Sequence, residues 1–148
     1  KIASVRNGYF ANIAWGTDID TVKEKVDQAY NCDSSISRDR DSVIVDIENY
    51  EKMDGVSAMT ILYCKEGERL NEVSTIFVIH DDSTYSESKV VKKIVEIYSK
   101  LYGKYEQEQD DECFLYTWKT KNSYIELAGI EEKVVLLQFK QLDDVNSD

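Results

Sequence analysis

The sequence predicts an α+β fold made of two α-β-β-β units, with an antiparallel sheet and the helices packed on one face. Three observations support this prediction. Two segments place apolar residues at a helical period, six short segments are apolar or alternate like strands, and short turns separate the strands within each unit. Short turns join antiparallel strands, whereas parallel strands need long crossover connections.

The first helix is expected at 18–30. Ile19, Val22 and Val26 recur at the spacing of one helical face. Thr17 is the expected N-cap, and Asp20 stands three residues later, close to the pattern of a capping box. The polar stretch that follows this helix, at 31–41, is expected to be a loop.

The pair Trp15–Gly16 stands just before this helix and predicts a strand-to-helix elbow. Phe10, Ile13 and Trp15 are apolar, and Trp15 is placed to pack back on the first helical turns as in a hydrophobic staple. Gly16 gives the backbone a freedom that other residues lack. A ligand site at the elbow is the alternative interpretation.

The second helix is expected at 85–102, with Thr84 and Glu87 as a capping box and Gly103 as the C-terminal cap. Three strands are expected to follow each helix. Their predicted ranges are 42–48, 56–64 and 70–80 in the first unit, and 112–118, 123–128 and 133–140 in the second. The length favours a single domain spanning residues 1–148, with 8–82 and 83–142 as two tandem halves.

The stretch F-A-N-I-A-W-G-T-D-I-D-T-V, together with the later L-Y-G at 101–103, resembles a group of small bacterial secreted or lipid-anchored proteins of unknown function. Their domains open with a short strand, an I-x-W-G-T elbow and an acidic helix. The repeated layout is also similar to the β-lactamase-inhibitor-protein-like fold, although that fold carries two helices per sheet. The resemblance implies an exported domain and carries over no catalytic residue.

The balance of charged residues indicates which classes of partner the protein is expected to bind. Eighteen Lys and Arg stand against 29 Asp and Glu, which gives a net charge of −11. Such a surface repels phosphate backbones and anionic membranes but attracts basic proteins. The acids are scattered rather than ranked in rows, which argues against a DNA mimic. No apolar run is long enough to span a membrane, so membrane contact is expected only through an upstream lipid anchor. Lys1 is the first residue, and a trimmed boundary or a removed leader are the alternatives.

The cysteines and the single histidine suggest no catalytic site. The spacing of Cys32, Cys64 and Cys113 matches no zinc pattern, and buried thiols are expected, with one disulfide plus one thiol as the alternative. His80 is the only histidine, and nothing in the sequence pairs it with a thiol.

Several short motifs match known sites only in part. Ser86 and Lys89 match S-x-x-K without the other motifs of the serine enzymes that use it. The His-Asp-Asp at 80–82 lacks a second histidine for a metal, and 39–41 lacks the rest of a calcium loop. The acidic stretch 106–112 is expected to be a solvated loop, with weak cation binding as the alternative. No cofactor, catalytic residue or metal ligand is therefore assigned.

Two predicted strands are apolar on both sides. Phe114, Tyr116 and Trp118 alternate with less aromatic neighbours in one strand, and a second strand behaves similarly around Tyr63. With helices on one face, the other face either presents these aromatics or exposes the aliphatic side while the aromatics form the core. The candidate binding residues are Tyr63, Tyr116, Trp118 and Tyr124.

These observations favour a non-enzymatic, exported binding module that holds a protein or a cell-envelope ligand, with an inhibitor of another protein as its specific form. The alternatives are a small hydrolase that uses two carboxylates and an intracellular immunity or interaction protein. The expected location is extracellular or at the cell surface, with the cytoplasm as the alternative. Nucleic acid is not an expected partner.

Overall fold

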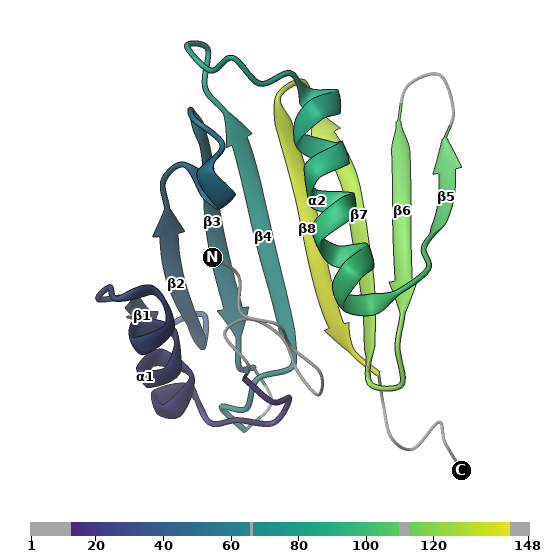
Figure 1. The fold of residues 1–148 in the computed structure, drawn as a ribbon. Coiled ribbons are helices and arrows are strands. Elements are labelled where there is room, and N and C mark those ends of the chain that lie inside the picture. The colour runs from purple at the N-terminus through teal and green to yellow at the C-terminus, as the bar shows by residue number, and fades with distance from the viewer. Residues whose placement is uncertain (1–12, 66, 110–112, 143–148) are drawn as a thin grey trace.

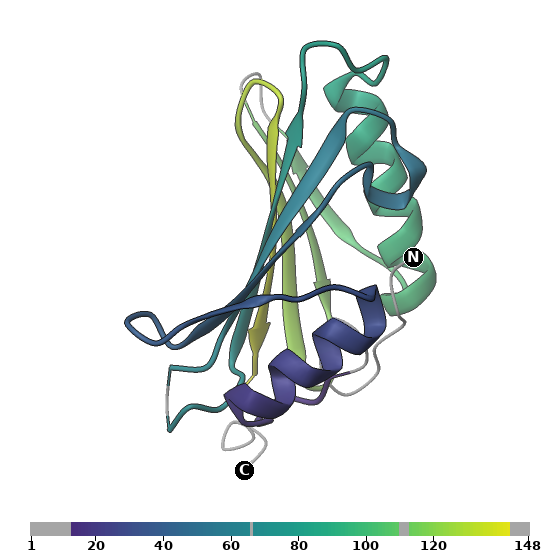
Figure 2. The same cartoon turned by 90° about the vertical axis from the view of Figure 1, so that its left-hand side faces the viewer.

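The computed structural model describes residues 13–65, 67–109 and 113–142. They form an eight-stranded antiparallel sheet with α1 (Ile19–Tyr30) and α2 (Glu87–Tyr102) on the same face (Figures 1 and 2), which confirms the predicted α+β class. A single 3₁₀ turn, η1 (Tyr50–Lys52), precedes the third strand. The strands are β1 (Ser35–Ser37), β2 (Ser42–Ile47), β3 (Val56–Tyr63), β4 (Glu72–Ile79), β5 (Glu106–Gln109), β6 (Phe114–Lys119), β7 (Ser123–Glu131) and β8 (Val134–Gln141).

The two halves of the chain have the same layout. The strand order is β1-β2-β3-β4-β8-β7-β6-β5, so each half is a helix followed by four neighbouring strands, and the halves meet where β4 pairs with β8. The sequence predicted three strands in each unit and missed β1 and β5, which lie in the segments expected to be loops. Both are short and polar and lie at the outer edges of the sheet, so neither shows the apolar alternation that reveals a strand.

The hydrophobic core lies between the sheet and the two helices. One row of paired residues on the helix side runs across five strands, and Tyr98 of α2 packs against two of its rings, with centroids 5.6 Å away at Phe139 and 6.4 Å away at Trp118. The row consists of Leu62, Val73, Phe139, Ile125 and Trp118. Each of these side chains is at most 1% exposed.

The helix caps differ from the predicted ones by one or two residues. Asp18, not Thr17, caps α1, because its side chain accepts a hydrogen bond from the Thr21 amide, whereas the Thr17 hydroxyl donates to the carbonyl of Ala14 at 2.7 Å. At α2, Ser86 rather than Thr84 accepts from the Lys89 amide. Both changes replace the expected cap by a neighbour with a suitable oxygen.

The C-terminal cap of α2 is confirmed. The Gly103 amide donates to the carbonyl of Ser99 at 2.8 Å, and the residue has the positive φ that glycine tolerates. Within α2 the buried Tyr98 also bonds through its hydroxyl to the hydroxyl of Tyr50 in η1, at 3.2 Å. The helix is thereby tied to both halves of the sheet.

The turn at Trp15 and Gly16 agrees with the predicted elbow, but no strand precedes α1 within the described residues, and Trp15 makes a contact that the expected staple does not include. Gly16 has φ +87° and donates its amide to the carbonyl of Leu70 at 2.8 Å. The Leu70 amide returns a bond of the same length to Thr17. Trp15 reaches across to the second half, where its Nε1–H donates to the Ser123 hydroxyl at 2.8 Å. Phe10, the first apolar residue of the predicted elbow, lies outside the described residues.

Candidate binding surfaces

The four candidate binding residues lie on opposite faces of the sheet. Tyr63 and Tyr124 occupy one row on the face without helices, with the paired Glu72 and Lys140 between them. Trp118 is 1% exposed in the core under α2, so it is not available to a partner.

Tyr116 also lies on the helix side, beside α2, and is half-buried. The four residues therefore do not form one surface. The sequence left open whether the aromatic or the aliphatic side of β6 is buried. In the structure the aromatic side packs toward α2, and the aliphatic side is open. The reason is the position of α2, whose apolar side lies over the β6 rings.

The face without described helices carries an aliphatic row, called here the open-face row. It crosses five neighbouring strands in register, so its side chains form one continuous strip. Each side chain is partly exposed. The open-face row consists of Met59, Ile76, Leu136, Ala128 and Leu115.

Acidic side chains border the open-face row. Asp46 pairs with Met59 at one end, and Glu108 pairs with Leu115 at the other. Partial burial and then the carboxylates of Glu126, Glu108 and Glu106 raise the pKa of Tyr124. The open face therefore combines an apolar strip that has a carboxylate at each end with a row beyond it in which Lys119 and Lys140 pair with Tyr124.

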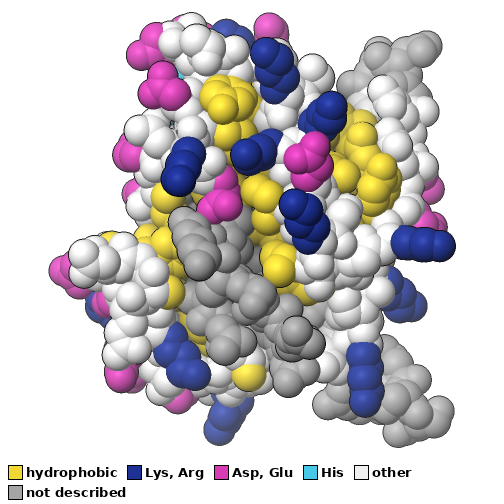
Figure 3. All heavy atoms as spheres, in the orientation of Figure 1, with side chains coloured by type: hydrophobic (Ala, Val, Ile, Leu, Met, Phe, Trp, Pro, Cys, Tyr) yellow, Lys and Arg dark blue, Asp and Glu magenta, His cyan; other side chains and the backbone are white. Residues whose placement is uncertain are grey.

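A groove on the other face lies between α2 and the β5–β6 hairpin, with a volume of about 600 Å³. Figure 3 shows hydrophobic side chains beside the charged surface of α2 in this region. Its apolar lining comes from Val91 and Val95 of α2 and from three rings opposite them. The size and the mostly apolar lining are typical of a ligand pocket.

Two of the three rings that line the groove pack at an angle against the third, Tyr116. Its centroid lies 5.3 Å from that of Tyr105, at 63°, and 5.9 Å from that of Phe114, at 59°. The Tyr116 hydroxyl accepts a bond from the Gln107 side chain at 3.1 Å. Sequence reasoning missed Tyr105, because it stands between elements, where no periodicity marks a residue's neighbours.

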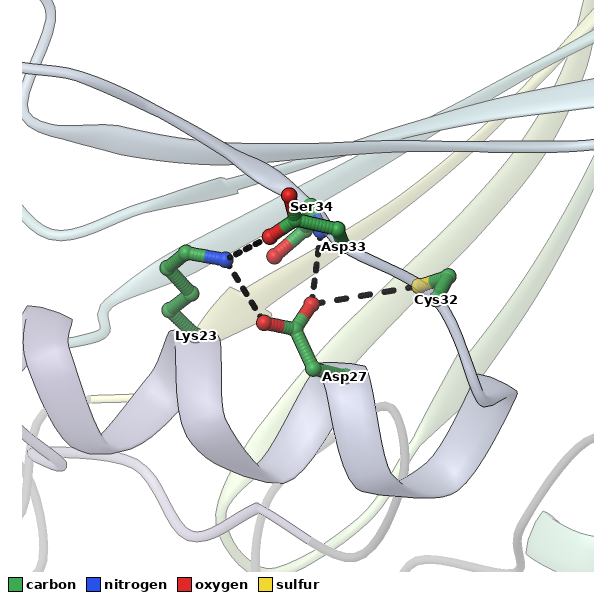
Figure 4. A network of polar contacts seen from close by, with 5 residues as sticks. All are labelled: Lys23, Asp27, Cys32, Asp33 and Ser34. Atoms are coloured by element: carbon green, nitrogen blue, oxygen red, sulfur yellow. Dashed lines mark hydrogen bonds and ion pairs between the residues drawn. The ribbon is translucent and has the colours of Figure 1, made fainter.

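A polar network at the end of α1 is structural. Asp27 accepts from Lys23 at 2.6 Å and from the Ser34 amide at 2.7 Å, and Lys23 also reaches Asp33 at 2.9 Å (Figure 4). Partial burial acts to raise the pKa of Asp27, but the hydrogen bonds from Lys23 and Ser34 outweigh it and lower this pKa to about 2. A carboxylate held in its charged form in this way anchors the loop after α1 and is a poor general acid.

The environments of Cys32 and Cys64 disfavour a nucleophilic thiolate. Burial, followed by nearby carboxylates, raises the pKa of the Cys64 thiol to about 11. Burial and then Asp27 raise the pKa of Cys32, which disfavours the reactive thiolate. All three cysteines are among the described residues, and no disulfide joins them. The expectation of buried thiols holds for Cys64 only, because Cys32 is partly exposed and Cys113 is exposed.

The partial motifs have structural roles in the parts that are described. Ser86 of the S-x-x-K match caps α2. Asp81, beside His80, pairs with Lys133 at 3.1 Å, and no group of three His, Cys, Asp or Glu side chains within the described ranges is placed to hold a metal. In the acidic stretch 106–112, β5 replaces part of the expected loop, and residues 110–112 lie outside the described residues.

No family model, no curated protein and no solved structure matches this chain. Neither of the described helices has both the length and the apolar composition that crossing a membrane requires.

Proposed function

We propose that this protein is a non-enzymatic binding module that docks a partner protein on its helix-free sheet face. The open-face row carries the proposal. It is a partly exposed aliphatic strip that crosses five strands, and a contiguous apolar patch with a polar border is the usual anatomy of a protein interface. An inhibitor of another protein is the specific form that the resemblance favours.

The charges around the row suggest the chemistry of the partner. Asp46 and Glu108 stand at its two ends, Glu126 lies on the same face, and the whole chain carries −11. A partner surface with an apolar centre and basic side chains around it would complement this face. Rim charges mainly steer association, so the association rate should fall as salt is added.

Two tyrosines give the face polar anchors. Tyr63 and Tyr124 share one row beyond the open-face row, and the Lys65 ammonium lies 4.8 Å from the Tyr63 ring centroid. Tyrosine combines a large apolar body with a polar tip, which suits the edge of an interface. These two of the four candidate residues therefore remain in the proposed site.

The geometry gives less support to a carboxylate hydrolase. Glu87 and Glu96 both line the groove, but nine positions along α2 separate them by about 13 Å of helix axis. Glycoside hydrolysis uses carboxyl groups about 5 to 9.5 Å apart. The pKa values of Asp18 and Asp27 are lowered, which disfavours a general acid, and neither residue lines the groove.

The docking proposal is tested by site-specific photocrosslinking in the protein's own cells. A photoreactive phenylalanine replaces Tyr63 or Tyr124, and the same probe replaces the exposed Lys93 on α2 as a matched control. We expect one defined adduct from the two open-face positions and not from position 93. Ile76→Glu, which places a charge in the open-face row, should abolish that adduct. Equal adducts from all three positions, or adducts insensitive to Ile76→Glu, would contradict the proposal.

The exported location is part of the proposal and rests on the resemblance to secreted and lipid-anchored domains. Fractionation of the cells after labelling with a radioactive lipid precursor tests it. We expect the protein in the envelope or the medium, with a lipid label if it is anchored. Unlabelled protein confined to the cytosol would favour an intracellular interaction protein instead.

A further inference from the structure

The groove between α2 and the β5–β6 hairpin lies on the face opposite the proposed docking surface and needs a separate explanation. It holds about 600 Å³ and is lined by rings on one wall and by Val91 and Val95 on the other. Tyr105 is 42% exposed, although large apolar side chains in this structure are mostly covered. A ligand that covered this ring would remove apolar surface from water, which is favourable.

The arrangement of the rings favours a particular kind of ligand. Tyr105 and Phe114 are tilted by about 60° to Tyr116, on either side of it. Such a corner presents ring faces and edges in more than one direction, as in the aromatic cages that hold quaternary ammonium groups. A flat apolar ligand would pack better between two parallel rings.

The charges of the residues that line the groove also bear on the kind of ligand. Glu87 lines the groove and is half-buried, while Glu96 and Lys92, the one cation among the lining residues, also line it and are both exposed. Within the described residues neither glutamate forms an ion pair. The lining therefore carries a net negative charge, and no described cation neutralises it through an ion pair. The net charge of the whole chain is also negative, at −11.

We propose that this groove binds an organic cation of the trimethylammonium class. The methyl groups pack against Tyr105, Phe114 and Tyr116, and Glu87 supplies the opposite charge at one end. Because α2 and β6 run in the same direction (Figure 1), Glu87 lies toward the Phe114 end and Glu96 toward the Tyr105 end. The site is independent of the open-face row.

The experiment titrates the protein with choline and, in parallel, with its uncharged tert-butyl isostere, which has the same shape. Methyl NMR signals of Val91 and Val95 report binding within the groove. We expect saturable shifts with choline, and affinity for the isostere at least about fivefold lower, because only the cation gains from the rings and the carboxylate.

Two groove variants and two control variants on the other face sharpen the test. Tyr105→Leu and Glu87→Gln should each weaken choline binding by about three- to tenfold, and Tyr105 is exposed enough for its replacement to leave the core intact. Tyr63→Leu, on the other face, should change nothing, and neither should Ile76→Glu. Equal binding of the isostere, no saturable shift, or variants at Tyr105 and Glu87 that bind like the unchanged protein would overturn the proposal, without bearing on the docking surface.

Discussion

Asp27 determines how the chain leaves α1. Its side chain is 24% exposed and accepts hydrogen bonds from Lys23 and from the backbone of Ser34. We expect Asp27→Asn to lower the free energy of unfolding by about 1 to 2 kcal/mol at neutral pH. Urea unfolding measures the loss. Asp33→Asn is the matched control: Asp33 contacts the same lysine but is 98% exposed, and its loss should cost little.

The same carboxylate predicts a pH dependence. The pKa of Asp27 is lowered from 3.8 to about 2 in the folded protein. A lowered folded-state pKa contributes stability that is complete above the unfolded value and is lost as the pH falls through the folded value. The stability gap between the unchanged protein and Asp27→Asn should therefore shrink between about pH 5 and pH 2. A gap that stays constant over this range would show that the hydrogen bonds do not depend on the charge.

Gly55 marks a place where the backbone is closely covered. Its φ is +76°, and an added Cβ would lie 2.6 Å from the Cβ and 2.9 Å from the Cα of Ser83. We expect Gly55→Ala to destabilise the protein by about 3 kcal/mol, from a strained backbone plus a steric overlap that the chain cannot easily relieve. Gly16→Ala shares the positive φ, at +87°, but has open space at the Cβ, so it should cost about 1 kcal/mol. Similar losses in thermal unfolding would contradict the steric argument.

At the scale of secondary-structure elements, the sequence predicted the helices and strands whose apolar pattern lies within their own residues. Both helices and six strands have their expected places to within a few residues, because their apolar residues recur at the period of the element. The short strand β5 reads Glu-Gln-Glu-Gln and forms by pairing with β6. Its structure comes from a neighbour rather than from its own pattern, as does that of β1, paired with β2.

The candidate site was less predictable for the same reason. Alternation showed that β6 has an aromatic and an aliphatic side, but only the position of α2 decides which of them is buried. Tyr105 enters the groove from the connection between α2 and β5, which has no period. Tertiary contacts of this kind leave no signal in a single sequence.

The elbow before α1 is an element whose anchor lies in the other half of the chain. Trp15 donates to Ser123 of β7, and both residues are largely covered. In a double-mutant cycle, Trp15→Phe and Ser123→Ala should show a coupling energy of about 0.5 to 1.5 kcal/mol in urea unfolding. Strictly additive losses would mean that this bond does not hold the halves together.

At the scale of the whole molecule, one sheet runs through both halves. β4 and β8 pair through seven residues, from Glu72 with Lys140 to Val78 with Val134. Core rings from both halves meet over this seam, where Tyr50 packs on Phe77 and also bonds to Tyr98. Because neither half covers its own core without the other, we expect the protein to unfold as one cooperative unit.

A core substitution in the first half tests this cooperativity through a reporter in the second. Phe77 in β4 is fully buried, so Phe77→Ala should cost about 3 to 5 kcal/mol. In a Trp15→Phe background, Trp118 of β6 is the only tryptophan, and its fluorescence should follow the same lowered urea midpoint as the circular dichroism of the whole chain. If the halves were independent, the Trp118 transition would stay where it was before the substitution, while the circular dichroism would separate into two steps. Coincident transitions before and after the change would mean that the two halves, joined in one sheet by the pairing of β4 with β8, unfold together.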